Sequence, residues 1–383
     1  MKNKKIVCAF LTAFLCVTAV SCGNSDEKSK EDSVESQTET EVQTEAETTT
    51  EQETTTESDT QAETSEAATE EDTAEPETQA EANVSAYGTM ADLSKYVTAT
   101  EVRPPLWKVT DPETNNELYI MGTIHVLPDT FTEFPDYIMD IYENSDGVAV
   151  EYDVSQIQSD IRAMMAFQQM FMYEDGSVIT DHISDETYQK AKSYLESIGA
   201  YTPEFDQFSA GYWYNQISSV MMLRLENLSM TGVDSTFVEN AKNDGKEVVN
   251  IETLDIQVGA VDGYSDELVD YLLSDIIDEI DEIDEFAESL GELYDSWAAG
   301  NVDEMLDDEM EEIDELPEDL KDDYADYNDI MLYNRNKGMA EKASGFLKDG
   351  KNYLFMVGSA HYAGDKGVDD LLAEMGYTVE KIA

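Results

Sequence analysis

The sequence has 383 residues, of which 86 are acidic and 22 basic, so its formal net charge at pH 7 is -64. Such a chain repels the phosphates of DNA and RNA, which argues against nucleic acid as a partner. The length is enough for one large domain or two small ones, together with extended segments.

The first 22 residues have the pattern of a bacterial lipoprotein signal peptide. Residues 1–5 include three lysines, and residues 6–20 form an apolar run that is too short for a comfortable membrane span. Small residues then precede Cys22, although Ala19 stands where such signals usually have leucine. We therefore expect Cys22 to be lipidated and the chain to be anchored on the extracytoplasmic face of a bacterial membrane. An ordinary cleaved signal with an incidental cysteine is the alternative.

Cysteine usage is consistent with this anchor. Cys8 and Cys16 lie within the segment that cleavage would remove, which leaves Cys22 as the remaining cysteine. No disulfide is then expected within one mature chain, and no zinc site built from thiolates.

Residues 23–87 differ in composition from the rest of the chain, with Thr, Glu, Ser, Gln and Ala predominating and almost no large apolar side chains. Such a segment cannot bury enough apolar surface to offset the entropy of ordering, so disorder is predicted. Repulsion between its carboxylates extends it. We interpret it as an acidic tether that holds a folded domain, residues 88–383, away from the membrane; a partner-binding tail is the alternative.

The folded part begins with a strand, a helix and a second strand. Apolar residues 118–121 predict a strand that runs directly into Gly122-Thr123-Ile124-His125. Residues 133–144 have the spacing of a helix, and residues 146–151 predict a buried strand that ends in an acid, Glu151. This order indicates a βαβ unit with parallel strands.

The middle of the chain is predicted to be mostly helical. Methionines and aromatic residues between 155 and 228 are expected to fill a core rather than bind a cofactor. His182 is expected to be structural or exposed, beside a helix start capped by Ser184. A further helix over residues 232–243 precedes a strand over 246–252, which again ends in an acid, Glu252.

Residues 276–297 predict one long amphipathic helix, because isoleucine, phenylalanine, leucine and tryptophan recur every three or four residues. Its other face is mostly Asp and Glu. We expect that face to be solvated rather than to bind calcium, because no twelve-residue calcium loop occurs in the sequence.

The end of the chain repeats the pattern of the beginning. An apolar strand over residues 352–357 is followed by Gly358-Ser359-Ala360-His361, then by a helix over 367–375 and a strand over 377–382. Two of the three histidines in the chain thus occupy the same place after a strand. This repetition favours a functional site over two satisfied core histidines.

The repeated motif suggests a specific chemistry. Residues just beyond the carboxyl ends of parallel strands converge on one crevice, which Glu151 and Glu252 could also enter. Imidazoles with carboxylates are suitable ligands for a divalent metal that activates water, and without metal they can act as general acids and bases. Because neither a zinc-protease helix motif nor a nucleophilic serine elbow occurs, water is the expected nucleophile.

Several short motifs, in their order along residues 103–383, resemble the TraB/GumN family, which is related to the Tiki metalloproteases. They are Pro105-Leu106-Trp107, Val148-Ala149-Val150-Glu151, Gly232-Val233-Asp234, Ile251-Glu252-Thr253, Arg335-Asn336 and Val357-Gly358-Ser359-Ala360-His361. The resemblance implies an α/β fold with a mixed sheet, built from two similar βαβ-containing halves with a mostly helical insertion at residues 155–330.

The resemblance also implies roles for individual residues. His125, His361 and Glu151 would bind a divalent metal, manganese or cobalt rather than zinc, with Gly122 and Gly358 as the motif glycines. The catalytic residues would be Glu151, Arg335 and Asn336, with Glu252 as a further candidate. A surface salt bridge is the alternative role for Arg335.

Tiki proteins are membrane-tethered, metal-dependent peptidases, whereas other members of the family have no settled activity. We therefore expect a lipid-anchored, metal-dependent hydrolase that acts on peptides. One alternative is a non-catalytic surface protein that sequesters a peptide signal or a small-molecule ligand. Another is an esterase-like hydrolase, because the erythromycin esterases are distantly related in fold.

Overall fold

The computed structural model describes residues 87–305, 313 and 316–383. The predicted signal peptide with Cys22, and all of the predicted tether except its last residue, lie outside this part of the chain. Within it, no helix combines the length and apolar character needed to cross a membrane.

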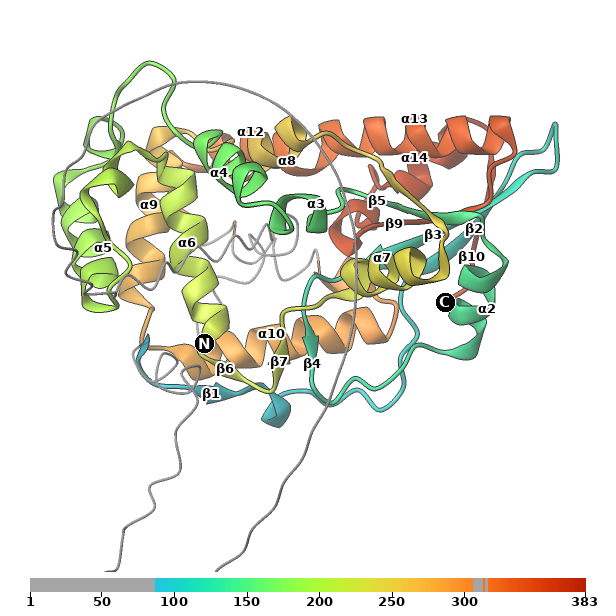
Figure 1. Ribbon diagram of the computed structural model, residues 1–383, viewed down its shortest axis with the longest axis horizontal. Coiled ribbons are helices and arrows are strands. Elements are labelled where there is room, and N and C mark those ends of the chain that lie inside the picture. The colour runs from blue at the N-terminus through green and yellow to red at the C-terminus, as the bar shows by residue number, and fades with distance from the viewer. Residues whose placement is uncertain (1–86, 306–312, 314–315) are drawn as a thin grey trace, which may run out of the picture. The chain divides into compact units, whose positions relative to one another are not determined.

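The described chain is built around a six-stranded mixed sheet with strand order β10-β2-β3-β9-β5-β8. Five of these strands run in the same direction, and β2 is antiparallel to both of its neighbours (Figure 1). The expected mixed α/β fold is confirmed. The strands are β2 (Leu106–Thr110), β3 (Glu117–Thr123), β5 (Gly147–Val150), β8 (Glu247–Asn250), β9 (Tyr353–Gly358) and β10 (Thr378–Lys381).

Strand β9 is buried on both faces, as its uninterrupted apolar sequence predicts. Its side chains alternate between two cores: Leu354 and Met356 enter one, and Phe355 and Val357 enter the other. Helices α2 (Asp136–Asn144) and α7 (Val233–Asp244) cover the first face, whereas α13 (Asn334–Asp349) and α14 (Val368–Glu374) cover the second (Figure 1).

The two strand–helix–strand units are present as predicted. In the first, β3 leads through α2 to β5, and in the second, β9 leads through α14 to β10. In each unit the two strands run in the same direction but are not neighbours, because β9 pairs with both β3 and β5. The last long strand of the chain therefore joins the two halves of the sheet.

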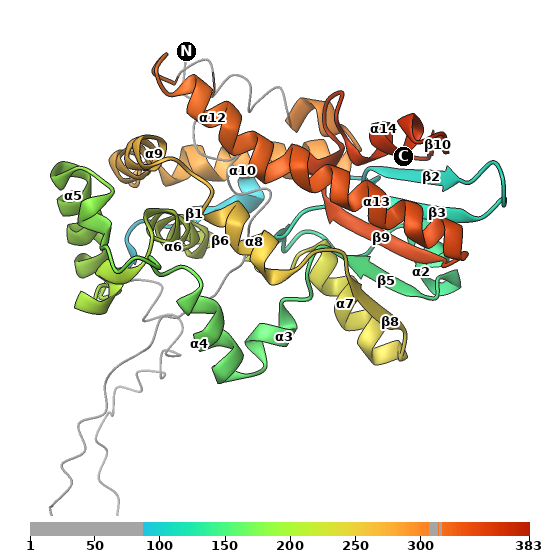
Figure 2. The same cartoon turned by 90° about the horizontal axis from the view of Figure 1, so that it is seen from above.

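The region expected to be a mostly helical insertion, residues 155–330, contains the helix and the strand predicted at 232–243 and 246–252. Helix α7 and strand β8 interrupt it and return to the sheet, where β8 pairs with β5. The other helices here pack together beside the sheet (Figure 2). They are α3 (Ser155–Gln158), α4 (Ile161–Gln169), α5 (Asp185–Ser197), α6 (Ala210–Leu223), α8 (Leu254–Val261), α9 (Asp266–Asp278), α10 (Ile283–Ala298) and α12 (Lys321–Asn328).

The single long helix predicted over residues 276–297 is wrong. Helix α9 ends at Asp278 and α10 begins at Ile283. Acids at a helix N-terminus are favourable, whereas acids in a helix interior near other acids repel one another. The break places Asp284 and Glu285 in the first turn of α10, while Ile276 and Ile283 both remain buried.

The structural role expected for His182 is confirmed. Ser184 caps α5, where its side chain accepts a hydrogen bond from the N–H of Thr187. The His182 ring stacks on Tyr173 with 3.9 Å between ring centroids, and its Nδ1 lies 3.1 Å from Asp266. The histidine therefore links a loop to α9.

One element had no signature in the sequence. A π-helical turn, η6 (Asp329–Tyr333), lies between α12 and α13. Turns of this type are rare and occur often at functional sites. Helix α13, which comes directly after it, carries Arg335 and Asn336 in its first turn.

Candidate functional site

The two Gly-x-x-His motifs lie side by side at one end of the sheet. Strands β3 and β9 are parallel neighbours, with Gly122 opposite Val357 and Thr123 opposite Gly358. Glu151 follows β5 on the other side of β9, and Glu252 lies two residues beyond the end of β8. The sheet thus brings all four predicted groups to the carboxyl ends of adjacent strands, as expected for ligand sites of α/β proteins.

The motif glycines allow close packing at this edge. A Cβ atom on Gly122 would lie 2.7 Å from Ser359 Oγ and 3.3 Å from its Cα. The Gly122 carbonyl also accepts a hydrogen bond of 3.0 Å from the buried Trp297 indole. Gly358 acts through its backbone, whose N–H donates to Glu151 Oε1 at 2.6 Å.

His361 is fully buried, and its protonation follows from its neighbour Asn336. Asn336 Nδ2 donates to the carbonyl of Lys366 at 2.9 Å, so its Oδ1 faces His361 Nδ1 at 2.6 Å. Nδ1 therefore carries the proton, and Nε2 presents a lone pair. Burial, together with the charge of Arg335, lowers the pKa of His361 to about 3, so the ring is neutral at pH 7.

His361 Nε2 has no hydrogen-bond partner among the described residues. It lies 3.6 Å from Glu151 Oε1, the oxygen that also accepts from Gly358. A lone pair facing a carboxylate is unfavourable unless a proton or a cation lies between them.

Behind the cavity, Arg335 binds two carboxylates at once. Its Nη2 lies 2.5 Å from Glu151 Oε2 and 2.8 Å from Glu252 Oε2, and its Nε donates to Glu252 Oε1 at 3.0 Å. The Gln257 amide donates to Glu252 at 2.5 Å and to Glu151 at 3.2 Å. Because Arg335 is only 5% exposed, it is part of a buried ion cluster rather than a surface salt bridge.

The two carboxyl groups of this cluster are not equivalent. Burial opposes ionisation of Glu151, but the charge of Arg335, with His361 and His125, outweighs it and lowers the pKa to about 2. Burial raises the pKa of Glu252, despite its contacts with Arg335, and the nearby charge of Glu151 adds to the rise.

His125 is oriented by Asp234, which lies in one of the family motifs but was not among the predicted site residues. His125 Nδ1 lies 3.2 Å from Asp234 Oδ1, and both side chains are partly exposed. Burial lowers the pKa of His125, but the charge and hydrogen bond of Asp234 outweigh this effect and raise it. Helix α7 presents Asp234 in its first turn.

Gly232, the residue before α7, lets this helix approach His125. A Cβ atom on Gly232 would lie 2.3 to 2.4 Å from the backbone of His125. The contact is reinforced by the N–H of Val233, which donates to the Ile124 carbonyl at 2.9 Å.

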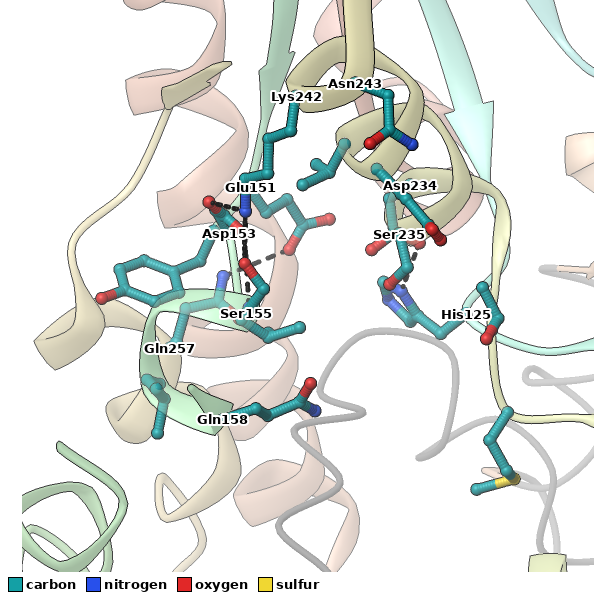
Figure 3. Close-up of a pocket in the computed structure, with 17 residues that line it drawn as sticks. His125, Glu151, Asp153, Ser155, Gln158, Asp234, Ser235, Lys242, Asn243 and Gln257 are labelled. Atoms are coloured by element: carbon teal, nitrogen blue, oxygen red, sulfur yellow. Dashed lines mark hydrogen bonds and ion pairs between the residues drawn. The ribbon is translucent and has the colours of Figure 1, made fainter. Parts of the chain in front are cut away.

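A cavity of about 430 Å³ opens onto these groups, and His125, Glu151, Asp234 and Gln257 are among its lining residues. Figure 3 shows His125, Asp234 and Ser235 on one side and Lys242, Asp153 and Ser155 on the other. His361, Arg335 and Asn336 do not line the cavity. Arg335 and His361 instead lie next to Glu151, which does line it.

The second wall of the cavity is an ion pair that the sequence did not predict. Lys242 Nζ lies 2.7 Å from Asp153 Oδ2 and also hydrogen-bonds to Ser155 Oγ. Asp153 is only 3% exposed and also accepts from Ser155 Oγ at 2.7 Å. This pairing neutralises the lysine, the one Lys or Arg among the residues that line the cavity.

The described residues do not fit a metal ion in this conformation. No three of their His, Cys, Asp or Glu side chains gather as a metal site. His361 and Glu151 approach each other with suitable donor atoms, but Arg335 and Gln257 bind the other carboxylate oxygens, and Asp234 holds His125. Metal binding by His125, His361 and Glu151 therefore stays a prediction.

The mixed sheet, with two strand-ending Gly-x-x-His motifs above a buried Arg–Glu cluster, agrees with a known family. The chain belongs to the TraB/PrgY/gumN family, whose sequence model matches residues 105–381. This confirms the resemblance seen in the sequence.

Among curated proteins, the chain is similar to the metalloprotease TIKI2 of Danio rerio. The two are 20% identical over 331 residues, which cover 75% of this chain and 62% of the relative. The chain thus spans less than two thirds of the length of this relative. No solved structure gives a significant match.

Proposed function

We propose that this protein is a lipid-anchored, extracytoplasmic hydrolase that cleaves peptides in the cavity between His125 and Lys242. Family membership and the distant similarity to a protein named as a metalloprotease give a coarse indication of a hydrolase. The cavity, which is large enough for a few amino-acid side chains, supports a peptide as the substrate.

The observation that carries the proposal is the His125–Asp234 pair on the cavity wall. A histidine held by a carboxylate is a common proton-transfer group, since the carboxylate orients the ring and stabilises its charged form. The contact joins Nδ1 to Asp234, which leaves Nε2 to take a proton from water or donate one to a leaving amine.

Of the other predicted residues, some can contact the substrate and others hold the residues that do. Glu151 lines the cavity and can contact the substrate directly. Arg335 and Asn336 are positioning residues, because they contact Glu151 and His361 rather than the cavity. In an alternative form of the proposal, His125, His361 and Glu151 would bind a divalent metal, manganese or cobalt, and His125 Nε2 would then be a ligand rather than a proton-transfer group. Such a metal would supply Lewis acidity and an activated water.

Peptide cleavage by the purified mature chain, with manganese or cobalt added, tests the proposal. His125→Ala is expected to lower kcat/KM by about 100-fold or more, as removal of a general acid–base does. His182→Gln is the matched control, since it removes a histidine outside the cavity and is expected to leave kcat/KM nearly unchanged.

A non-catalytic peptide-binding protein is the second candidate. The observation that favours it is the completeness of the buried cluster, in which both Glu151 oxygens already accept hydrogen bonds. Equal peptide affinity in the wild type and His125→Ala, with no cleavage by either, would establish this function instead.

Membrane attachment is proposed from the sequence around Cys22. Cys22→Ser is expected to move the protein from the membrane fraction to the soluble exported fraction and to abolish incorporation of a labelled fatty acid. Fractionation followed by immunoblotting measures the first effect. Retention of label by the variant would contradict the lipoprotein assignment.

A further inference from the structure

The cavity of the proposed active site has an excess of negative charge. Its lining residues include four acids, Glu151, Asp153, Asp234 and Glu239, but Lys242 is the one lysine among them and there is no arginine. Charges of one sign in a cavity with low-dielectric walls attract ligands of the opposite sign. How strongly this cavity does so depends on which of its acids are already paired.

Three of the four acids already contact a basic side chain. The distances are 2.5 Å from Glu151 to Arg335, 2.7 Å from Asp153 to Lys242 and 3.2 Å from Asp234 to His125. These contacts reduce the negative charge that the three acids present to a substrate.

Glu239 is the exception. Its side chain is exposed, lines the cavity, and has no ion pair or hydrogen bond with any residue in the described part of the chain. Lys242 lies nearly one turn further along α7, but it pairs with Asp153 instead. The Glu239 carboxylate is therefore free to bind a positive group that enters the cavity.

The position of Glu239 on α7 relates it to the proposed proton-transfer pair. Glu239 comes five residues after Asp234, which places it about 7.5 Å further along the helix axis. An extended peptide covers this distance with about two residues. A peptide whose cleaved bond lies at His125 would therefore present its positive charge to Glu239 within about two residues of that bond.

A negative group of a substrate finds no comparable partner in this cavity. Lys242 is its one lysine, and it is held by Asp153, which is only 3% exposed. A free C-terminal carboxylate that took Lys242 would leave this buried acid unpaired, which is strongly unfavourable. The cavity therefore discriminates against acidic peptides.

We propose that the substrate is a cationic peptide, which Glu239 recognises through an ammonium or guanidinium group near the cleaved bond. A lysine or arginine side chain and a free N-terminal amine both offer this chemistry. The inference rests on the proposed function, since it names the substrate class of the same cavity. Glu239 is then the residue that determines specificity.

Cleavage of acetylated and amidated hexapeptides by the purified mature chain tests this inference. Each position in turn is lysine, norleucine or glutamate, because norleucine retains the methylene groups of lysine without its charge. The wild type is expected to cleave the best lysine peptide with about threefold higher kcat/KM than its norleucine counterpart, as a partly exposed ion pair provides. This charge preference should decrease in about 1 M NaCl, which screens the pair.

The same peptides with a free N-terminus distinguish the two sources of the charge. A terminal amine as the recognised group would give the charge preference between free and acetylated peptides, whereas a side chain would give it between lysine and norleucine. Equal kcat/KM in both comparisons would overturn the inference.

Glu239→Gln is expected to remove the charge preference, and Glu239→Lys to reverse it in favour of glutamate peptides. Glu143→Gln is the matched control, because Glu143 is an exposed acid on α2 that does not line the cavity, so it is expected to keep the wild-type preference. A charge preference that survives in Glu239→Gln would contradict recognition by this residue.

Binding of the same peptides, measured by isothermal titration calorimetry, separates this inference from the proposed function. If the wild type cleaves none of them, tighter binding of the charged peptides that is lost in Glu239→Gln would support the recognition and reject the hydrolase. Cleavage without a charge preference would reject the recognition and leave the hydrolase intact.

Discussion

Gly232→Ala is expected to destabilise the domain by about 3 kcal/mol or more, a value at the upper end for overpacking. The added Cβ would lie 2.3 to 2.4 Å from backbone atoms of His125, which, unlike a side chain, cannot rotate away. The start of α7 must then separate from the segment after β3. This separation breaks the Val233–Ile124 hydrogen bond and moves Asp234 from His125.

Urea denaturation followed by circular dichroism measures this loss, and peptide cleavage in the same variant reports on the displaced His125. Gly345→Ala is the matched control, because Gly345 lies within helix α13 and a Cβ there would meet nothing within 4 Å. It is expected to be neutral or to stabilise by up to about 1 kcal/mol, since alanine favours helix. Wild-type stability in Gly232→Ala would show that the contact is not needed.

Glu151→Gln and Glu252→Gln are expected to differ strongly, although both remove one negative charge from the same cluster. Glu151→Gln should cost about 3 to 5 kcal/mol, because it removes the carboxylate that accepts from Gly358 and pairs with Arg335. Burial and the charge of Glu151 raise the pKa of Glu252, so less of the stabilisation comes from its charged form and the loss in Glu252→Gln should be clearly smaller.

The pH dependence of unfolding provides a further check of this difference. The pKa of Glu151 is lowered to about 2, so its stabilisation is fully present above its usual pKa and is lost as pH falls toward 2. The gap between the wild type and Glu151→Gln should therefore be constant from pH 6 to 7 and narrow below about pH 4.5. Equal losses in the two variants, or a gap that widens in acid, would contradict this account.

Local patterns were sufficient to predict most of the sheet and the place of the histidines. Strands β3, β5 and β9 are short apolar runs, and in each case the residues just beyond the run contain the functional side chain. Because parallel strands align their carboxyl ends, the approach of His125, His361 and Glu151 followed from the strand assignments alone.

The partners of these residues could not be predicted in the same way. Asp234, Gln257 and Lys242 are polar residues on helices, where acids and amides are abundant in this chain and most are solvated. Which of them turn inward depends on how α7 and α8 pack against the sheet, and this packing joins segments distant in sequence. The motif Gly232-Val233-Asp234 was the one signal in the sequence for these partners. It contains the glycine that lies against the His125 backbone and the carboxylate that contacts the His125 ring.

The ion cluster around Arg335 and the break between α9 and α10 could not be predicted for a similar reason. Arg335 and Asn336 are adjacent in the sequence. The two carboxylates that pair with Arg335, those of Glu151 and Glu252, follow different strands and approach it only in the folded chain. The break between α9 and α10 depends on a balance between repulsion of neighbouring acids and burial of isoleucines, which spacing alone does not reveal.

The position of β9 between β3 and β5 has a consequence for the order of folding. This strand comes near the end of the chain, and the Gly358–Glu151 hydrogen bond joins residues 207 positions apart. Until β9 arrives, β3 and β5 each have an unpaired edge, a state in which chains readily associate with one another. A chain synthesised from its N-terminus would therefore need protection from aggregation until its final strands are complete, and no product shortened before β9 could assemble the site.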